Sequence, residues 1–388
     1  MESYRHSSHT TSDKFPIVKD KLLLLLLSLA VLGAILQITV GGVVRVTGSG
    51  DGCPDWPTCY GQWIPPLDQQ TIDKLWTGSP TSIPRPHHVL LEYSHRSIGT
   101  LLGLTIVAAV VRLWLRHRSE SVVAWLASAE LGLIAIVGML GGLVVLNDLD
   151  PALRTTHLFL AEIVVCLGVL ALVAASHSRN GSIGDSSRWI WGRVSNEHRS
   201  ALNLAAAAAI LSLVALLSGS YAVWKDAGAV CTSWPLCGPD LIPKSGLAWI
   251  HMSHRLLSLA SVIAVLLAGH RVWRLPNTSK TLRAAALGSA ILIFAQMLMG
   301  AANPWTAFSV WARAGHLSLA TVVWIDMVLL VAFKNDPAGH NMANFISEGM
   351  KDDGDIFRGK KFDLVEIDSP AISADWLDEK YDYDAFVF

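Results

Sequence analysis

The motif "EYSHR" at 92–96 returns as "HMSHR" at 251–255, and this repeat decides the predicted fold. A second pair of segments keeps the same offset of 159 residues: "ALRTTHLFLA" at 152–161 and "WARAGHLSLA" at 311–320. Two unrelated helical bundles would not keep one register over such a length. The chain is therefore predicted to contain two similar units in tandem.

The segments around these motifs are strongly apolar. Of the 388 residues, 52% are hydrophobic and 16% are charged, and the mean hydropathy is +0.43. An average soluble domain is about 25% charged. Uncharged runs at 22–44, 201–224 and 284–312 have the length that a membrane-spanning helix needs, which is roughly 20 residues. The first run exceeds the apolar core of a signal peptide and lacks a small-residue cleavage site, so we expect it to be retained.

The hydropathy pattern predicts an all-α integral membrane protein with eight transmembrane helices. Each unit receives four of them, an even number, so the two four-helix bundles should have the same orientation, as parallel repeats. The predicted spans are 22–45, 89–111, 122–146, 152–175, 201–223, 248–272, 284–304 and 310–333.

The charges outside the spans predict the topology. Lys and Arg gather in the N-terminal arm and in alternate loops, and such segments stay in the cytoplasm. Both termini should therefore be cytoplasmic, and the cysteine-containing loops should face outward. The arm has no Arg-rich amphipathic presequence, which favours a bacterial plasma membrane. The predicted parts are the arm (1–21), the first half (22–175), a cytoplasmic linker (176–200), the second half (201–333) and an acidic, disordered tail (334–388).

The repeat preserves four histidines, His95, His157, His254 and His316, each near the outer end of its helix. Ionisable residues within membrane spans are costly and usually functional, although a single one is often a hydrogen-bonded packing residue. Two imidazoles that face each other in an apolar bundle suit the two axial positions of a haem iron. Zinc suits these pairs less well, because no third or fourth ligand lies nearby in the sequence.

Two cysteine pairs lie in the outer loops, Cys53 with Cys59 in "CPDWPTC" and Cys231 with Cys237 in "CTSWPLC". On the oxidising side of a membrane, such pairs are expected to form disulfides that brace a loop. A reactive role is the alternative, since an exposed disulfide can be reduced or exchanged.

The repeat fails at one informative position, where Glu92 in the first half corresponds to His251 in the second. Glu92 lies three residues before His95, so the two share a helix face. A carboxylate beside one haem site alone is expected to be catalytic. The alternative is a carboxylate that only forms a hydrogen bond with Arg96 or a neighbouring helix.

Four arginines lie at the depth of the histidines: Arg96, Arg154, Arg255 and Arg313. Haem propionates are carboxylates, which a guanidinium binds through two hydrogen bonds, so these arginines are candidate propionate partners. The alternative is that they extend to the lipid headgroups.

With these residues in view, the sequence resembles the haem A synthase family over residues 22–333. The resemblance rests on "GGVVRVTGSGDGCPDWPTCYGQWIP" at 41–65, on "EYSHR", on "LRTTHL" and on the second "SHR", in this order. It implies an oxidoreductase that converts the C8 methyl group of haem O into the formyl group of haem A, the cofactor of terminal cytochrome oxidases.

The resemblance also implies roles for individual residues. His95 and His157 would hold the substrate haem, Glu92 would be catalytic, and His254 and His316 would bind a haem b cofactor. It links the first cysteine pair to function and the second to structure.

The implied partners are haem O, the farnesyl-adding haem O synthase and an electron donor, and nothing in the chain predicts nucleic-acid binding. The sequence leaves the oligomeric state open. A dihaem electron-transfer cytochrome explains the four histidines equally well, but it leaves Glu92 and the cysteine motif without a role. A non-enzymatic haem carrier for oxidase assembly would bind haem without converting it. A transporter with parallel repeats would place its polar residues near mid-membrane instead.

Overall fold

A computed structural model describes residues 17–118, 121–177, 196–238, 242–276, 278 and 280–332. The predicted acidic tail, most of the predicted linker and most of the N-terminal arm lie outside the described residues. No strand occurs in the part of the chain that is described.

The described residues form eight long helices, and all eight are long and apolar enough to cross a membrane. The prediction of an all-α membrane protein with eight spans is confirmed, with boundaries that differ by a few residues. The helices are α1 (Lys21–Val46), α3 (Pro86–Arg116), α4 (Ser121–Leu146), α5 (Pro151–His177), α7 (Asn196–Trp224), α8 (Gly246–Trp273), α9 (Lys280–Trp305) and α10 (Val310–Ala332).

The starts of the helices follow from local sequence. Asp20 caps α1, because its Oδ1 accepts a hydrogen bond from the Leu23 N–H at 3.1 Å. Ser245 caps α8 through the Ala248 N–H. Helix α3 begins at Pro86, and a proline costs little in a first turn, where its missing N–H has no intrahelical partner. A short helix in the first large loop, α2 (Gln69–Leu75), has no counterpart in the predicted spans.

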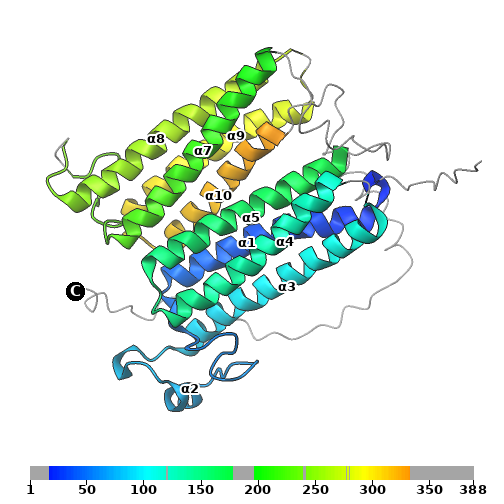
Figure 1. Cartoon of the computed structure of the whole chain (residues 1–388). Coiled ribbons are helices and arrows are strands. Elements are labelled where there is room, and N and C mark those ends of the chain that lie inside the picture. Colours follow the sequence, from blue (N-terminus) through cyan, green and yellow to red (C-terminus); the bar gives the residue numbers. More distant parts are fainter. Residues whose placement is uncertain are drawn as a thin grey trace, which may run out of the picture. The chain divides into compact units, whose positions relative to one another are not determined.

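Each half is a closed ring of four helices, and the two rings lie side by side (Figure 1). In the first half α1 contacts α3, α3 contacts α4, α4 contacts α5, and α5 contacts α1. Helices α7, α8, α9 and α10 follow the same order in the second half. The halves meet through α1 with α10, α5 with α10, and α5 with α7.

One contact at this boundary joins a residue to its own repeat equivalent. Thr321 of α10 lies 159 positions after Glu162 of α5, and its hydroxyl donates a hydrogen bond of 2.7 Å to the Glu162 Oε1. Equivalent positions on equivalent helices meet where a twofold axis relates two units. The contact therefore supports the predicted relation between the halves.

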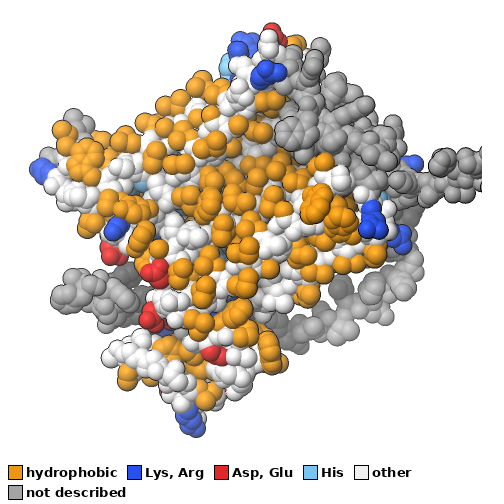
Figure 2. All heavy atoms as spheres, viewed as in Figure 1, with side chains coloured by type: hydrophobic (Ala, Val, Ile, Leu, Met, Phe, Trp, Pro, Cys, Tyr) orange, Lys and Arg blue, Asp and Glu red, His pale blue; other side chains and the backbone are white. Residues whose placement is uncertain are grey.

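Hydrophobic side chains cover the flank of the helical bundle, whereas charged side chains gather at its ends (Figure 2). Long apolar side chains of the helices, such as Leu32, Leu104, Leu115 and Ile210, are exposed. A soluble protein rarely exposes so large an apolar surface. This surface and the eight candidate spans fit a multi-pass membrane protein. Below, "disulfide end" means the end of the bundle that carries the loop segments 47–85 and 225–238.

Candidate functional site

The disulfide end carries both predicted cysteine pairs, and each pair forms a disulfide. The Cα atoms lie 4.8 Å apart for Cys53 and Cys59, and 4.4 Å apart for Cys231 and Cys237. Each bond closes a loop of the same length, so the two halves share this feature.

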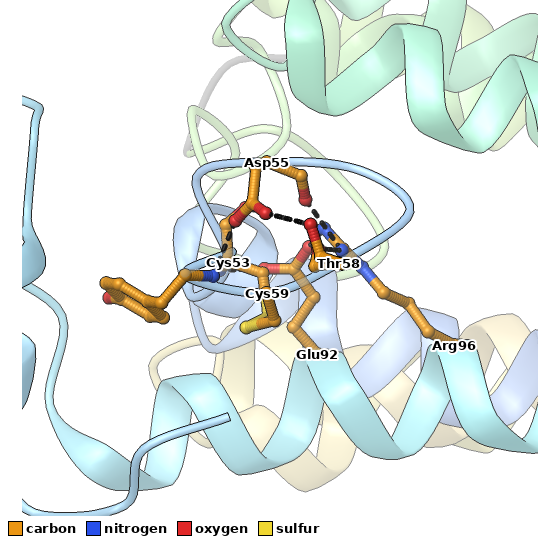
Figure 3. A network of polar contacts seen from close by, with 7 residues as sticks. Cys53, Asp55, Thr58, Cys59, Glu92 and Arg96 are labelled. Carbon is orange, nitrogen blue, oxygen red and sulfur yellow. Dashed lines mark hydrogen bonds and ion pairs between the residues drawn. A yellow bond between two sulfur atoms is a disulfide. The ribbon is translucent and has the colours of Figure 1, made fainter. Parts of the chain in front are cut away.

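Arg96 holds the first disulfide loop in place (Figure 3). Its Nη1 donates to the carbonyl oxygens of Asp55 and Thr58, both at 2.8 Å, and its Nη2 donates to the Cys53 carbonyl at 3.4 Å. Nη2 also pairs with the Glu92 carboxylate. The donors of Arg96 are thus directed to the loop and to Glu92.

Arg255 holds the second disulfide loop in the same manner. Its Nη1 donates to the carbonyl oxygens of Ser233, Pro235 and Leu236 at 2.8, 3.0 and 2.9 Å, and its Nη2 donates to Cys231 at 3.1 Å. The guanidinium groups of Arg96 and Arg255 are thus directed to the disulfide loops, a contact that neither the propionate expectation nor the headgroup expectation included. Both bind backbone carbonyl groups, which leave no signature in a sequence.

Glu92 is buried, with 4% of its surface exposed, beneath the first disulfide loop. Its Oε2 accepts a hydrogen bond of 2.7 Å from the backbone N–H of Cys53, and its Oε1 pairs with Arg96. The expected contact with Arg96 is therefore present. The contact with the loop was not foreseen, and it fixes both carboxylate oxygens.

A second carboxylate shapes the same loop. The Asp55 side chain accepts hydrogen bonds from the backbone N–H groups of Tyr60 and Gly61, at 2.5 and 3.0 Å, and from the Thr58 hydroxyl. Burial raises the pKa of Asp55, but these hydrogen bonds outweigh it and hold the pKa below its ordinary value. Burial, with Glu92 and Asp55 nearby, raises the pKa of Tyr60 to about 12. The loop thus carries an ionised Asp55 and a neutral Tyr60 at neutral pH.

His251 occupies the position of Glu92 in the second half and is also buried. Its Nδ1 lies 2.9 Å from the Ala227 carbonyl oxygen, which can only accept, so Nδ1 donates. Glu92 and His251 therefore each bind the backbone of the loop that precedes their own helix. Only Glu92 brings a carboxylate to it.

The four predicted haem ligands share one setting, because each packs its imidazole against a glycine of the preceding helix. A Cβ atom on that glycine would lie closer to the imidazole Cε1 than most Cβ contacts allow, so the glycine lets the ring pack closely against the helix. The Cβ–Cε1 distances would be 2.8 Å for Gly41 and His95, 3.1 Å for Gly141 and His157, 3.0 Å for Gly219 and His254, and 3.0 Å for Gly300 and His316.

The same setting directs Nδ1 toward the backbone. Nδ1 of His254 lies 3.1 Å from the carbonyl oxygen of Ala215, four residues before Gly219, and 2.9 Å from the Ser218 hydroxyl. The rings of the other three histidines are directed to carbonyl groups at the same place, on Gln37, Val137 and Gln296. Their Nδ1 atoms are buried and fall short of hydrogen-bond geometry. Histidines that bind metals commonly donate their second N–H to such a carbonyl.

The pairing of these histidines fits a metal held by two ligands. The ring centroids of His254 and His316 lie 6.3 Å apart, at an interplanar angle of 87°. Two imidazoles that share one metal ion, with metal–nitrogen bonds of about 2 Å, need a separation of this order. Among the described residues, no group of three or more His, Cys, Asp or Glu side chains is arranged to hold a metal. The donor set therefore fits a haem iron better than zinc.

Gln37 is a residue that the sequence reading missed. Its amide Nε2 lies 3.2 Å from Nε2 of His95. Ala215 takes the corresponding place in the second half, four residues before the glycine. The only signal in the sequence is one amide side chain within an otherwise apolar span.

Three carboxylates lie deep within the spans. Glu162 accepts from Thr321 as described above, and Asp326 Oδ2 accepts from the Ser289 hydroxyl at 2.5 Å. Glu130 is 1% exposed, and neither of its oxygens has a hydrogen-bond partner within the described chain. These contacts tie helices together, and none of them reaches the disulfide end.

The fold and this site define a class: a multi-pass helical membrane protein with two pairs of half-buried histidines, one pair in each half. The chain belongs to the COX15-CtaA family, described as cytochrome oxidase assembly protein, whose model matches residues 23–328. The resemblance that the motifs indicated is confirmed.

Two curated relatives align with most of the chain. A protein named "Heme A synthase" from Geobacillus kaustophilus is 24% identical over 308 residues, which cover 78% of this chain and 89% of the relative. Another of that name, from Symbiobacterium thermophilum, is 26% identical over 303 residues, 75% of this chain and 88% of the relative.

A third relative matches only a short segment. "D-aminoacyl-tRNA deacylase" from Cenarchaeum symbiosum is 61% identical over 62 residues, 16% of this chain. The match spans about a quarter of that relative, 24%. A similarity of this extent carries no argument about the function of the eight helices.

Proposed function

We propose that this protein is a haem A synthase, an oxidoreductase that converts the C8 methyl group of haem O into the formyl group of haem A. The observation that carries the proposal is an asymmetry within a repeat. All four histidines have the same glycine-backed setting, yet a carboxylate stands beside one pair only. The relatives named for this activity support the same function.

The first half (22–175) is the substrate half in this proposal. His95 and His157 hold the iron of haem O and so fix the position of its ring. Converting a methyl group to a formyl group adds an oxygen atom from water or O2 and removes electrons and protons from the reacting carbon. The electrons go to O2 or to an external acceptor, and the protons need a base nearby. Glu92 takes this role, because its carboxylate is held by the Cys53 N–H and Arg96 on the helix face of His95.

The second half (201–333) holds the cofactor. His254 and His316 are the ligands for haem b, which supplies one-electron transfer when bound. The residues fit this group, since Nδ1 of His254 is engaged with Ala215 and Ser218 and its Nε2 remains for the iron. His251 stands at the position that Glu92 holds in the first half, so the second half has no carboxylate there. This fits a half that carries electrons without acting on a substrate.

The topology completes the proposal. The disulfide end faces outward across a bacterial plasma membrane and both termini lie in the cytoplasm, in agreement with the basic loops. Haem O arrives from a farnesyl-adding synthase, and a separate donor or acceptor exchanges electrons with the haem b half.

Co-expression with a haem O-producing synthase, in a host that lacks haem A, tests the function. Extracted haems are separated by chromatography and identified by mass. Haem A or its hydroxymethyl precursor supports the proposal. Bound haem b with unchanged haem O, in a folded protein supplied with reductant, contradicts it and favours a dihaem electron carrier.

A further inference from the structure

Three arginines converge at the disulfide end of the boundary between the halves. Arg45 lies in the last turn of α1, Arg154 in the first turn of α5 and Arg313 in the first turn of α10. The charges of Arg154 and Arg313 are near enough to act on Arg45. Nη2 of Arg313 donates to the Val46 carbonyl at 2.9 Å, which places it beside the end of α1.

Two members of this cluster, Arg45 and Arg154, lack a direct carboxylate partner. Within the described part of the chain, no carboxylate forms an ion pair or a hydrogen bond with the side chain of Arg45 or Arg154. Asp51 acts on Arg154 at longer range, and burial followed by the like charge of Asp148 raises the pKa of Asp51. Positive charges that approach each other in a partly buried site are unfavourable unless an anion lies between them.

The register of the arginines relates them to the predicted haem ligands. Arg154 lies three residues before His157, and Arg313 lies three residues before His316. Arg45 lies four residues after Gly41, the glycine that backs His95. A helix rises by about 1.5 Å per residue, so a spacing of three or four residues is roughly one helical turn. Each of the three arginines therefore lies about one turn nearer the disulfide end than the histidine, or the glycine behind the histidine, on its own helix.

We propose that Arg45, Arg154 and Arg313 form a shared site for the propionate carboxylates of the haems held in the two halves. Guanidinium groups bind carboxylates in a planar, two-bond geometry, and propionates are the anionic part of a haem. This inference rests on the proposed haem-binding function. It joins Arg154 and Arg313, two of the arginines considered as propionate partners from the sequence, with Arg45, to which the sequence analysis assigned no role.

The test compares haem b with its dimethyl ester, whose propionates carry no charge. Full-length protein is stripped of haem in detergent, and each ligand is titrated by its absorbance change into wild type, Arg45→Gln and Arg154→Gln. Arg116→Gln is the matched control, because Arg116 is exposed at the opposite end of α3. Thermal unfolding of the haem-free variants shows that they remain folded.

Wild type and Arg116→Gln should bind haem b roughly tenfold or more tightly than the ester, the strength expected of a charge-assisted hydrogen bond. Arg45→Gln and Arg154→Gln should lose most of this preference while binding the ester as wild type does. An unchanged preference in both variants would overturn the inference.

Three further outcomes separate the possible causes of failure. If wild type binds the ester as tightly as haem b, the propionate site is wrong but haem binding stands. If wild type binds neither ligand, both this inference and the proposed function fail. Loss of co-purified phospholipid from the arginine variants, with the haem preference intact, would assign the cluster to a lipid phosphate and overturn the proposal.

Discussion

The Glu92 carboxylate accepts a hydrogen bond of 2.7 Å from the backbone N–H of Cys53. One residue of the first disulfide loop thus touches the residue proposed as the catalytic base. Arg96 closes the arrangement, because it binds both Glu92 and the carbonyl oxygens of the loop. The loop therefore positions the carboxylate, and this explains why a cysteine motif and a helix motif occur together in the chain.

Replacing Glu92 separates its charge from its contact with the loop. In Glu92→Gln, the amide oxygen still accepts from Cys53, so the fold and the second-half haem should be retained. Haem A formation should fall by about 100-fold or more, the usual effect of losing a general base. Haem extraction from the co-expression host measures the amount of haem A formed and the amount of haem retained in the second half. Glu197→Gln, at an exposed carboxylate in the first turn of α7, should leave both unchanged. Full haem A formation by Glu92→Gln would exclude Glu92 as the base.

The glycines behind the histidines give a prediction for each half. In Gly219→Ala, the new Cβ lies 3.0 Å from His254 Cε1, so the ring must move and haem b should be lost or spectrally altered. In Gly41→Ala, the corresponding distance to His95 is 2.8 Å, and haem O retention should fall while haem b remains. Reduced-minus-oxidised spectra and extracted haems report the two effects.

A third glycine provides the control for these substitutions. A Cβ on Gly103 of α3 meets no atom within 4 Å. Gly103→Ala should keep both haems and stabilise the protein slightly, since alanine favours a helix by up to about 1 kcal/mol over glycine. Equal haem loss in all three alanine variants would mean that the effect is on folding and not on the ligands.

Gln37 distinguishes the His95 setting from that of His254. Its amide donates to the lone pair of His95 Nε2, and an iron ion needs that lone pair, so this hydrogen bond must break when haem binds. Gln37→Ala, which copies Ala215, should tighten haem binding to the first half by about fivefold, from a net bond of about 1 kcal/mol. A titration of haem-free protein measures the change, and weaker binding would show that Gln37 supports the site.

The spans and the ligand candidates were predictable from the sequence, whereas their surroundings were not. Long uncharged runs are specific to membrane helices, and the repeat isolated four histidines from the others. The contacts of Arg96 and Arg255 run to backbone carbonyl oxygens, which every residue carries. The glycine behind each histidine comes from a different helix, so only the folded chain shows the pairing. Helix α2 is too short to leave a hydropathy signal.

The buried charges at the opposite end of the bundle also escaped the sequence reading. Asp20, 3% exposed, accepts hydrogen bonds from Arg112 Nε at 2.9 Å and from His117 Nε2 at 2.8 Å. Arg112 and His117 end α3, and Asp20 begins α1, so the cluster joins the two helices. Burial raises the pKa of Asp20, but the hydrogen bonds from Arg112, His117 and Leu23 outweigh it and hold the pKa below its ordinary value of 3.8.

Asp20→Asn should therefore destabilise the protein in a pH-dependent manner. Breaking a buried ion pair costs about 3 kcal/mol, at the lower end of the usual range because Arg112 stays partly exposed. A lowered pKa adds stability above the ordinary value, and this stability is lost as the pH falls through the folded-state pKa. The difference in Tm between wild type and Asp20→Asn should be full at neutral pH and shrink below about pH 4. Asp68→Asn, at the exposed N-cap of α2, should change the Tm little at either pH. A wild-type advantage that stays constant down to pH 3 would show that Asp20 acts through packing and not through its charge.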